Sequence, residues 1–363
     1  MALLNRAKRA FARQAWPDPG TDQLIKAVLL PPTEARRHWQ AWLQRNSIDD
    51  ATWPQMKILA RLSSRLPEID PGSSEIPRLN GLAKALWTQS QLRLNKATAA
   101  LDTLLAANIP VCLMKTAALE AMGLEKSTRR VTSDLDVLVR RSDLRQSFEL
   151  LFNTGWTSKD AAGVEAAIER VRYHPGINLE RGTEPGGAAI EIDVHHQPVH
   201  IPFLDEDTLR NLWSSARSAT FRGRGVLVPP LEEHLVFTAM QGVRRAIPSH
   251  LSSGMWAFDL ADGIASPRLD CTRLLVVAEA YEGCWPMLAC LSYLRSEIGV
   301  PVDERLLGEL SSRAHGLSQA MSLYAQAPTW GLLWPINIPL RELALLQLYR
   351  RFCAEGWQAS KRW

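Results

Sequence analysis

The stretch VTSDLDVLV, residues 131–139, predicts a β-strand because its acidic and aliphatic residues alternate. Asp134 and Asp136 share one face with Leu138, whereas the opposite face is aliphatic. Two carboxylates among apolar flanks repel each other and lose hydration unless a cation offsets their charge. Mg²⁺ prefers such oxygen ligands. The stretch therefore predicts either a divalent-metal site or an exposed strand face whose acids are solvated.

A second stretch, AIEIDVH at residues 189–195, repeats this pattern and favours the metal site. Glu191, Asp193 and His195 share one face of the expected strand, and the residues between them are aliphatic. A third carboxylate beside the first pair would complete a site for two metal ions about 3.5–4 Å apart. That arrangement serves phosphoryl transfer, because it holds both the attacking and the leaving oxygen.

Lys115 and Thr116 lie where the apolar run 109–114 leads into a helix expected over 117–122. Backbone N–H groups and the positive end of the helix dipole favour phosphate at such a junction. Both residues are therefore candidates for binding the phosphates of a nucleotide. A solvated lysine at the start of a helix explains Lys115 equally well.

Three segments of the chain differ in their patterns. Residues 1–95 show helical spacing broken by prolines, residues 96–228 mix strands with helices, and residues 229–363 show helical spacing throughout. A chain of 363 residues with 46% hydrophobic content can form two or three packed units. We expect an α+β protein with a helical N-terminal region, a catalytic core and a helical C-terminal domain. Strands of the core are expected within 109–114, 131–139, 176–179 and 189–195.

Composition excludes several classes of protein. The formal net charge of +4 is too balanced to indicate nucleic-acid binding, and no apolar run has the length of a membrane span. The N-terminus lacks the apolar stretch of a secretory signal. The cysteines show no metal-site or disulfide spacing and predict buried thiols in a reducing, cytoplasmic environment. They are Cys112, Cys271, Cys284, Cys290 and Cys353.

The motifs together resemble the DNA polymerase β-like nucleotidyltransferases, and more closely an uncharacterised bacterial family of that superfamily. The resemblance covers about residues 96–262. It is carried by MKTAAL at 114–119, RVTSDLDVLV at 130–139, IDVH at 192–195, PPLEEHL at 229–235 and WAFDL at 256–260. One departure is Thr116, which stands where the closer family usually has glycine, and whose Cβ disfavours a positive φ.

The resemblance implies a nucleotidyltransferase fold, a short mixed sheet flanked by helices, with a helical domain that helps hold the acceptor. It implies that Asp134 and Asp136 bind two Mg²⁺ or Mn²⁺ ions, and that Asp193 is the third carboxylate. Asp193 would also help activate the attacking hydroxyl. The substrate would be an NTP, and the acceptor an unknown small molecule or protein.

Four further residues have two readings each. Arg130 either binds phosphate or forms a structural ion pair with Asp134. His195 either meets the substrate and orients Asp193, or packs as a hydrogen-bonded histidine. Trp256 and Asp259 either line an acceptor cleft or only join helices.

Two functions follow from these patterns. The first is an enzyme that moves a nucleoside monophosphate from an NTP to a hydroxyl and releases pyrophosphate. The second is a catalytically degenerate or antitoxin-like module that keeps the fold to bind a protein partner. The intact set Asp134, Asp136 and Asp193 favours the enzyme, because a pure binding module gains nothing from three clustered charges.

Overall fold

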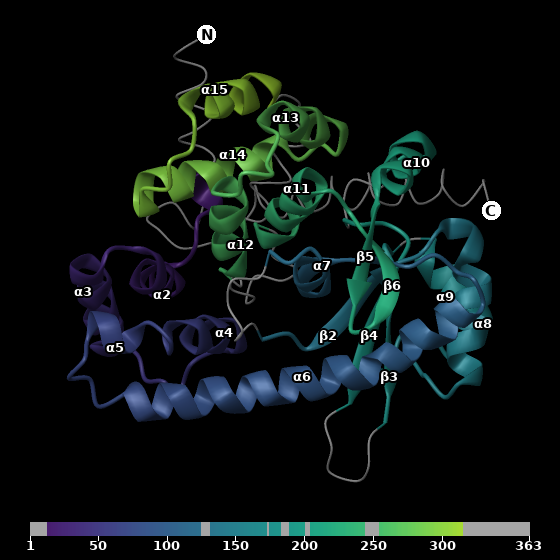
Figure 1. Ribbon diagram of the computed structural model, residues 1–363, viewed down its shortest axis with the longest axis horizontal. Coiled ribbons are helices and arrows are strands. Elements are labelled where there is room, and N and C mark those ends of the chain that lie inside the picture. Colours follow the sequence, from purple (N-terminus) through teal and green to yellow (C-terminus); the bar gives the residue numbers. More distant parts are fainter. Residues whose placement is uncertain are drawn as a thin grey trace, which may run out of the picture. The chain divides into compact units, whose positions relative to one another are not determined.

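The computed structural model describes residues 13–124, 131–172, 174–182, 189–199, 204–243 and 254–314 (Figure 1). Within these residues the chain forms two compact units, with boundaries between Ala85 and Leu86 and between Pro230 and Leu231. One unit combines helices from the beginning and the end of the described chain. The other unit contains the sheet.

The sheet is mixed and has six strands in the order β3-β4-β2-β1-β6-β5. Strand β2 runs parallel to β4 and β1 runs parallel to β6, whereas the other neighbours are antiparallel. The strands are β1 (Cys112–Leu113), β2 (Asp134–Leu138), β3 (Gly176–Arg181), β4 (Ile190–His195), β5 (Arg217–Phe221) and β6 (Arg224–Val228). The four predicted strands are thus confirmed, and β1 is shorter than expected.

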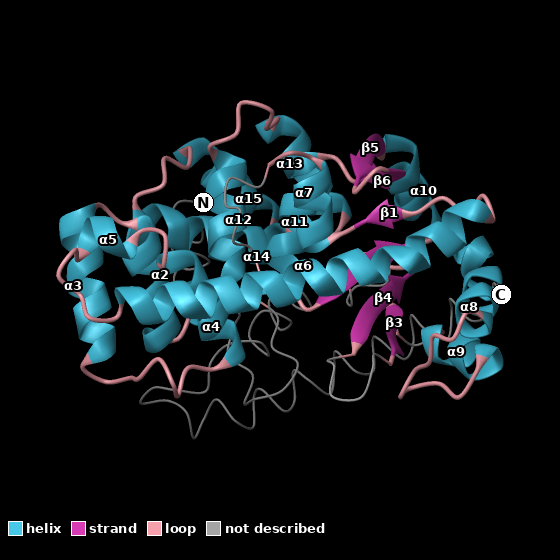
Figure 2. Cartoon of the chain, turned by 60° about the horizontal axis from the view of Figure 1, so that its bottom comes forward, coloured by secondary structure: helices cyan, strands magenta, loops and turns pink. Residues whose placement is uncertain are grey.

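Helices cover the aliphatic face of this sheet. Leu135, Val137, Ile192 and Val194 are fully buried and join apolar side chains of four helices in one core cluster. Those helices are α6 (Ile76–Ala106), α7 (Lys115–Ala121), α8 (Leu144–Asn153) and α9 (Val164–Val171), drawn in cyan near the magenta strands in Figure 2. The unit also contains η2 (Arg141–Asp143) and α10 (Glu206–Ser215). The predicted α+β fold class, a short mixed sheet flanked by helices, is confirmed.

The parallel pairing of β2 with β4 places the acidic residues of both strands side by side. Asp134 is opposite Glu191, and Asp136 is opposite Asp193. Because residues in register on neighbouring strands point to the same face, both carboxylate pairs lie on the face away from the core cluster. Packing of the aliphatic face against the core cluster fixes this register, since a slip of one residue would turn the acids toward that cluster.

The sequence pattern does not predict the hairpin of β5 and β6. Its first strand, RSATF, is mostly polar and exposed, so it lacks the aliphatic run that marks the other strands. The turn residues Arg222 and Gly223 have φ of +48° and +81°. Two consecutive positive φ values give the tight turn whose twist matches a two-residue hairpin.

The second unit is entirely helical in its described part. Ion pairs join its early and late helices: Lys26 to Glu297 at 2.8 Å, and Arg61 to Asp262 at 3.1 Å. Its elements are η1 (Arg13–Ala15), α2 (Pro19–Leu29), α3 (Pro32–Leu43), α4 (Trp53–Leu62), α5 (Leu66–Ile69), the part of α6 up to Ala85, α11 (Leu231–Gly242), α12 (Met255–Ile264), α13 (Cys271–Ala280), α14 (Cys284–Tyr293), η3 (Leu294–Ile298) and α15 (Glu304–Arg313). Among the described helices, none has both the length and the hydropathy that a bilayer crossing requires.

The cysteines follow the prediction in part. Cys112, Cys284 and Cys290 are buried thiols, and burial raises the pKa of each. Cys271 is exposed, which corrects the expectation, because it is the first residue of α13 and lies at a helix end. Cys353 lies outside the described residues.

Gly176 provides a test of the packing between β3 and β4. An added Cβ would lie 2.6 Å from the Val194 carbonyl oxygen and 2.8 Å from His195 Nδ1. We expect Gly176→Ala to lower the free energy of unfolding by roughly 1–3 kcal/mol, since the backbone of β4 must shift. Gly225→Ala in β6 is the control, because no atom lies within 4 Å of its added Cβ, and it should change stability by no more than about 0.5 kcal/mol. Denaturant unfolding measures both, and equal effects would contradict this packing.

Candidate active site

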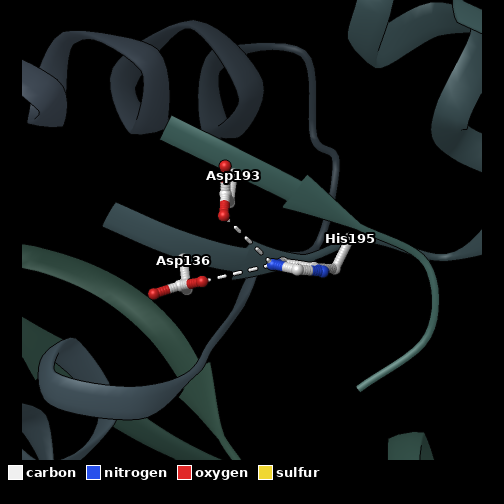
Figure 3. Close-up of side chains that lie close together, drawn as sticks. All are labelled: Asp136, Asp193 and His195. Atoms are coloured by element: carbon white, nitrogen blue, oxygen red, sulfur yellow. Dashed lines mark hydrogen bonds and ion pairs between the residues drawn. The ribbon is translucent and has the colours of Figure 1, made fainter. Parts of the chain in front are cut away.

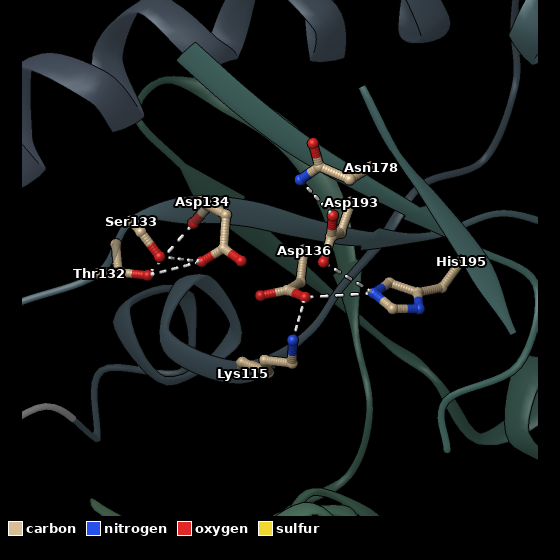
Figure 4. A network of polar contacts seen from close by, with 8 residues as sticks. All are labelled: Lys115, Thr132, Ser133, Asp134, Asp136, Asn178, Asp193 and His195. Carbon is tan, nitrogen blue, oxygen red and sulfur yellow. Dashed lines mark hydrogen bonds and ion pairs between the residues drawn. The ribbon is translucent and has the colours of Figure 1, made fainter. Parts of the chain in front are cut away.

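Asp136 is the buried centre of a polar cluster on the face of the sheet opposite the core cluster (Figure 4). Its carboxylate is only 3% exposed. Lys115 Nζ donates to Asp136 Oδ1, and His195 Nε2 lies 3.2 Å from the same oxygen. The position of Lys115 follows from strand pairing: the Met114 N–H donates to the Asp136 carbonyl at 3.0 Å, and α7 begins at the next residue.

The charges of this cluster stabilise one another. Burial raises the pKa of Asp136, but the Lys115 ammonium and the His195 hydrogen bond more than offset burial and bring that pKa to about 2. Burial also opposes the charge on Lys115, whereas attraction to Asp136, Asp134 and Asp193 raises its pKa overall. Lys115 and Asp136 therefore form an ionised pair at neutral pH.

Lys115 also carries backbone strain. Its φ is +48°, in the left-handed region that disfavours side chains with a Cβ. Among the described residues the positive φ at this strand–helix junction falls on Lys115 and not on Thr116. The threonine in place of the family's usual glycine therefore adds no φ strain at position 116. Strain of this kind persists where the surrounding structure holds the residue, and it is common at functional sites.

Asp193 lies beside Asp136 and is fixed by a neighbour on β3. Its Oδ1 accepts a hydrogen bond from Asn178 Nδ2 at 2.7 Å, and its Oδ2 lies 3.9 Å from His195 Nε2. Asn178 is directly opposite Asp193 in the antiparallel pairing of β3 with β4. The amide thus holds one carboxylate oxygen and leaves the other directed toward His195 (Figure 3).

Asp134 is the first residue of β2, and the two residues before it hold its side chain in place. Its Oδ1 accepts hydrogen bonds from Ser133 Oγ at 3.2 Å and from Thr132 Oγ1 at 3.4 Å. Thr132 is tied in turn to α6, because its N–H donates to Ser90 Oγ at 2.9 Å. These hydroxyls orient the Asp134 carboxylate while helix α6 anchors the start of the strand.

Comparison with known proteins identifies the family. Residues 51–296 match the sequence profile of a family described as "Uncharacterised nucleotidyltransferase". The chain belongs to this family. This confirms the predicted uncharacterised nucleotidyltransferase family, whereas its bacterial origin and its placement in the DNA polymerase β-like superfamily stay predictions.

Two other comparisons add little to this assignment. Among curated proteins, no significant match to the chain was found. Among solved structures, the chain is similar to an antigenic nucleotidyltransferase-like protein from Paracoccidioides brasiliensis at 15% identity and a TM-score of 0.35. That similarity covers 58% of this chain and 94% of the other. A TM-score this low does not support an inference about fold or function.

The donor atoms of this cluster fit a divalent cation. Ligand atoms of Asp136, Asp193 and His195 all lie within 4.8 Å of one another. Asp134 lies on the same face of β2, two residues before Asp136. Carboxylate oxygens with one imidazole nitrogen are ligands that divalent ions accept, and an ion would relieve the repulsion between the neighbouring acids.

The structure brings together only some of the residues predicted for the site. Asp134, Asp136, Asp193, Lys115 and His195 lie in one cluster, and Thr116 follows Lys115 in the first turn of α7. Arg130 lies outside the described residues.

Trp256 and Asp259 lie on α12 of the helical unit, where both are buried. The Trp256 ring contacts Tyr293 edge-on at 5.5 Å between centroids. This contact agrees with the reading in which the tryptophan joins helices. The acceptor role of Trp256 and Asp259 stays a prediction.

Asn178 is a site residue that the sequence analysis misses. Its strand was expected over 176–179, and period-two alternation puts Asn178 on the same face as its neighbours Gly176 and Glu180. What the sequence does not give is the register with β4, which alone brings Asn178 opposite Asp193. A search for amides as well as acids on the hairpin partner of the IDVH strand would find it.

Asn178 yields a prediction about the orientation of Asp193. In Asn178→Ala the carboxylate of Asp193 loses its fixed partner and rotates. We expect nucleotide transfer to fall about tenfold, as for other groups that orient metal ligands, with NTP affinity and melting temperature unchanged. The control is Asn95→Ala on the exposed side of α6, which should transfer at the wild-type rate. Transfer is followed as pyrophosphate release, and an unaltered rate in Asn178→Ala would refute the orienting role.

Proposed function

We propose that this protein is a metal-dependent nucleotidyltransferase that moves a nucleoside monophosphate from an NTP to a hydroxyl group. The observation that carries the proposal is the register of β2 with β4, which sets Asp136 directly opposite Asp193 on the polar face. Asp134 lies on the same face and completes the set of three carboxylates that such chemistry requires. Membership in a nucleotidyltransferase family supports the reaction class.

In the proposed reaction the acceptor hydroxyl oxygen attacks the α-phosphorus of the NTP. The bond between the α-phosphorus and the bridging oxygen breaks, pyrophosphate leaves, and the hydroxyl proton passes to Asp193. Asp193 suits this role because Asn178 holds its Oδ1 while Oδ2 faces the site. Lys115, Thr116 and Arg130 are the proposed contacts of the triphosphate, since a lysine at a helix start is a point charge for phosphate.

Asp134, Asp136 and Asp193 would hold the Mg²⁺ or Mn²⁺ ions of this reaction. When bound, the ions supply positive charge to the phosphate oxygens. The protein's part is to orient the carboxylates, through Ser133 for Asp134 and through Asn178 for Asp193. Lys115 balances Asp136 in the absence of an ion and is 38% exposed, so it can turn toward a phosphate.

The acceptor is proposed to be a hydroxyl of a small molecule or a protein, and the proposed location is the cytoplasm. Trp256 and Asp259 remain the proposed residues for acceptor binding. The alternative function, a binding module without catalysis, does not require that each of three carboxylates be oriented by hydrogen bonds. We therefore favour the enzyme.

Calorimetry tests this proposal without knowledge of the acceptor. We expect Mg²⁺ or Mn²⁺ and an NTP to bind far better together than either does alone, because the phosphates complete the coordination of the ions. The affinity of each should rise by the same factor in the presence of the other, since coupling is reciprocal. The combined change Asp134→Asn with Asp136→Asn should abolish the coupling. If that variant binds metal and nucleotide as the wild type does, the site lies elsewhere.

A further inference from the structure

His195 places a nitrogen atom among the carboxylates of the site. Its Nε2 lies 3.2 Å from Asp136 Oδ1 and 3.9 Å from Asp193 Oδ2 (Figure 3). The residue is 8% exposed, and its ring packs tightly against Gly176, whose missing Cβ leaves the space that Nδ1 fills. The nitrogen is therefore fixed in position before any ligand binds.

The spacing of the three donor atoms matches that of ligands on one ion. Donors bonded at about 2.1 Å lie about 3 Å apart when adjacent in an octahedron and about 4.2 Å apart when opposite. The separations of His195 Nε2 from Asp136 Oδ1 and Asp193 Oδ2, 3.2 and 3.9 Å, fall within these limits. Ligand atoms of all three residues lie within 4.8 Å of one another, so small rotations of the carboxylates would bring them onto one ion.

His195 can adopt the tautomer that binds a metal ion through Nε2. Nδ1 is buried and has no hydrogen-bond partner among the residues that the structure describes. No group in the described part of the chain on that side therefore decides which nitrogen carries the proton. The group that faces Nε2 decides it: carboxylates alone favour Nε2–H, whereas a cation favours a bare Nε2 with the proton on Nδ1.

We infer that His195 is a direct metal ligand through Nε2, together with Asp136 and Asp193, and that this nitrogen makes the site prefer Mn²⁺ over Mg²⁺. The inference rests on the proposed function and narrows it to a class of metal. Mg²⁺ takes oxygen ligands almost exclusively, whereas transition-metal ions accept imidazole readily. A site with two carboxylates and one imidazole suits Mn²⁺, which accepts both kinds of ligand.

The competing reading assigns His195 only a hydrogen bond to Asp136. In that case the ion would have oxygen ligands alone, and Mg²⁺ would serve as well as Mn²⁺. Besides this metal preference, the two readings differ in the magnetic coupling between a bound Mn²⁺ ion and a histidine nitrogen. An isotropic coupling of the size that coordinated imidazole gives requires the nitrogen to be bonded to the ion.

The experiment is pulsed electron paramagnetic resonance of the full chain with Mn²⁺ and a non-hydrolysable NTP analogue. We expect ¹⁴N modulation from a coordinated imidazole in the wild type, its replacement by the ¹⁵N pattern after selective ¹⁵N-histidine labelling, and its loss in His195→Gln. Glutamine keeps a hydrogen-bonding group near the position of Nε2 but offers oxygen as the ligand. His38→Gln in the helical unit is the control and should retain the modulation.

Titrations of the same proteins give the metal preference. The wild type should bind Mn²⁺ at least about tenfold more tightly than Mg²⁺, and His195→Gln should lose most of that difference. If His195→Gln fails to fold, the isotope exchange in the wild type still decides the ligation. Bound Mn²⁺ without histidine modulation would overturn the inference while leaving metal-dependent transfer intact. No Mn²⁺ binding at all would overturn the proposed metal site as well.

Discussion

Asp136→Asn should reduce nucleotide transfer by at least about a thousandfold, the largest loss expected from any single change in this chain. A thousandfold loss corresponds to roughly 4 kcal/mol of barrier, within the several kcal/mol that metal charge contributes to phosphoryl transfer. Asp136 has this weight because its carboxylate is central to the cluster, in contact with both Lys115 and His195. Asparagine keeps its size but removes the charge that holds an ion.

The measurement for Asp136→Asn is pyrophosphate release at saturating NTP, with thermal unfolding as the check on folding. Asp207→Asn removes a charge from an exposed position on α10 of the same unit and should transfer normally. A folded Asp136→Asn that retains a tenth of the wild-type rate would show that the carboxylate is structural.

Asp193→Asn should remove transfer while leaving much of the NTP binding, the second-largest effect. The third carboxylate serves the hydroxyl on the attacking side, whereas Asp134 and Asp136 hold the phosphates through their ions. We expect less than a tenth of the wild-type rate, a deficit of at least ~1.4 kcal/mol in barrier. NTP affinity should change far less than in Asp136→Asn.

Glu191→Gln is the matched control for Asp193→Asn. Glu191 lies two residues away on the same strand and the same face, so its neutralisation removes an equal charge from the same surface. Rates and NTP affinities of both variants separate a role of the Asp193 carboxylate from a general effect of charge. Similar losses in the two would refute the specific role.

Local patterns in the sequence are sufficient to predict the centre of the sheet. The alternation in residues 131–139 and 189–195 identifies β2 and β4, because one face of each strand is buried and must be aliphatic. The same pattern does not predict the β5–β6 hairpin, because strand β5 is mostly exposed and has no apolar face. The alternation of apolar and polar residues arises because one face of a strand is buried, so an exposed strand shows little of it.

The residues of the candidate site also divide into those that local patterns predict and those whose contacts depend on long-range pairing. Asp134, Asp136 and Asp193 are predictable because acids inside aliphatic strands are unusual. The pairing of Asn178 with Asp193 depends on the β3–β4 register, and the contact between Lys115 and Asp136 depends on β1 lying beside β2. These are long-range pairings that no local pattern specifies. Arg130 lies outside the described residues, and its role stays a prediction.

The most direct test of the account is transfer of label from each of the four NTPs, labelled at the α-phosphate, with a cell lysate as the source of acceptor. With Mg²⁺ or Mn²⁺ we expect one or more NTPs to label an acceptor and release unlabelled pyrophosphate in equal amount. Chelation of the metal or the change Asp136→Asn should stop both. Binding of NTP without transfer or pyrophosphate release, in the presence of metal and lysate, would contradict the account and favour the non-catalytic module.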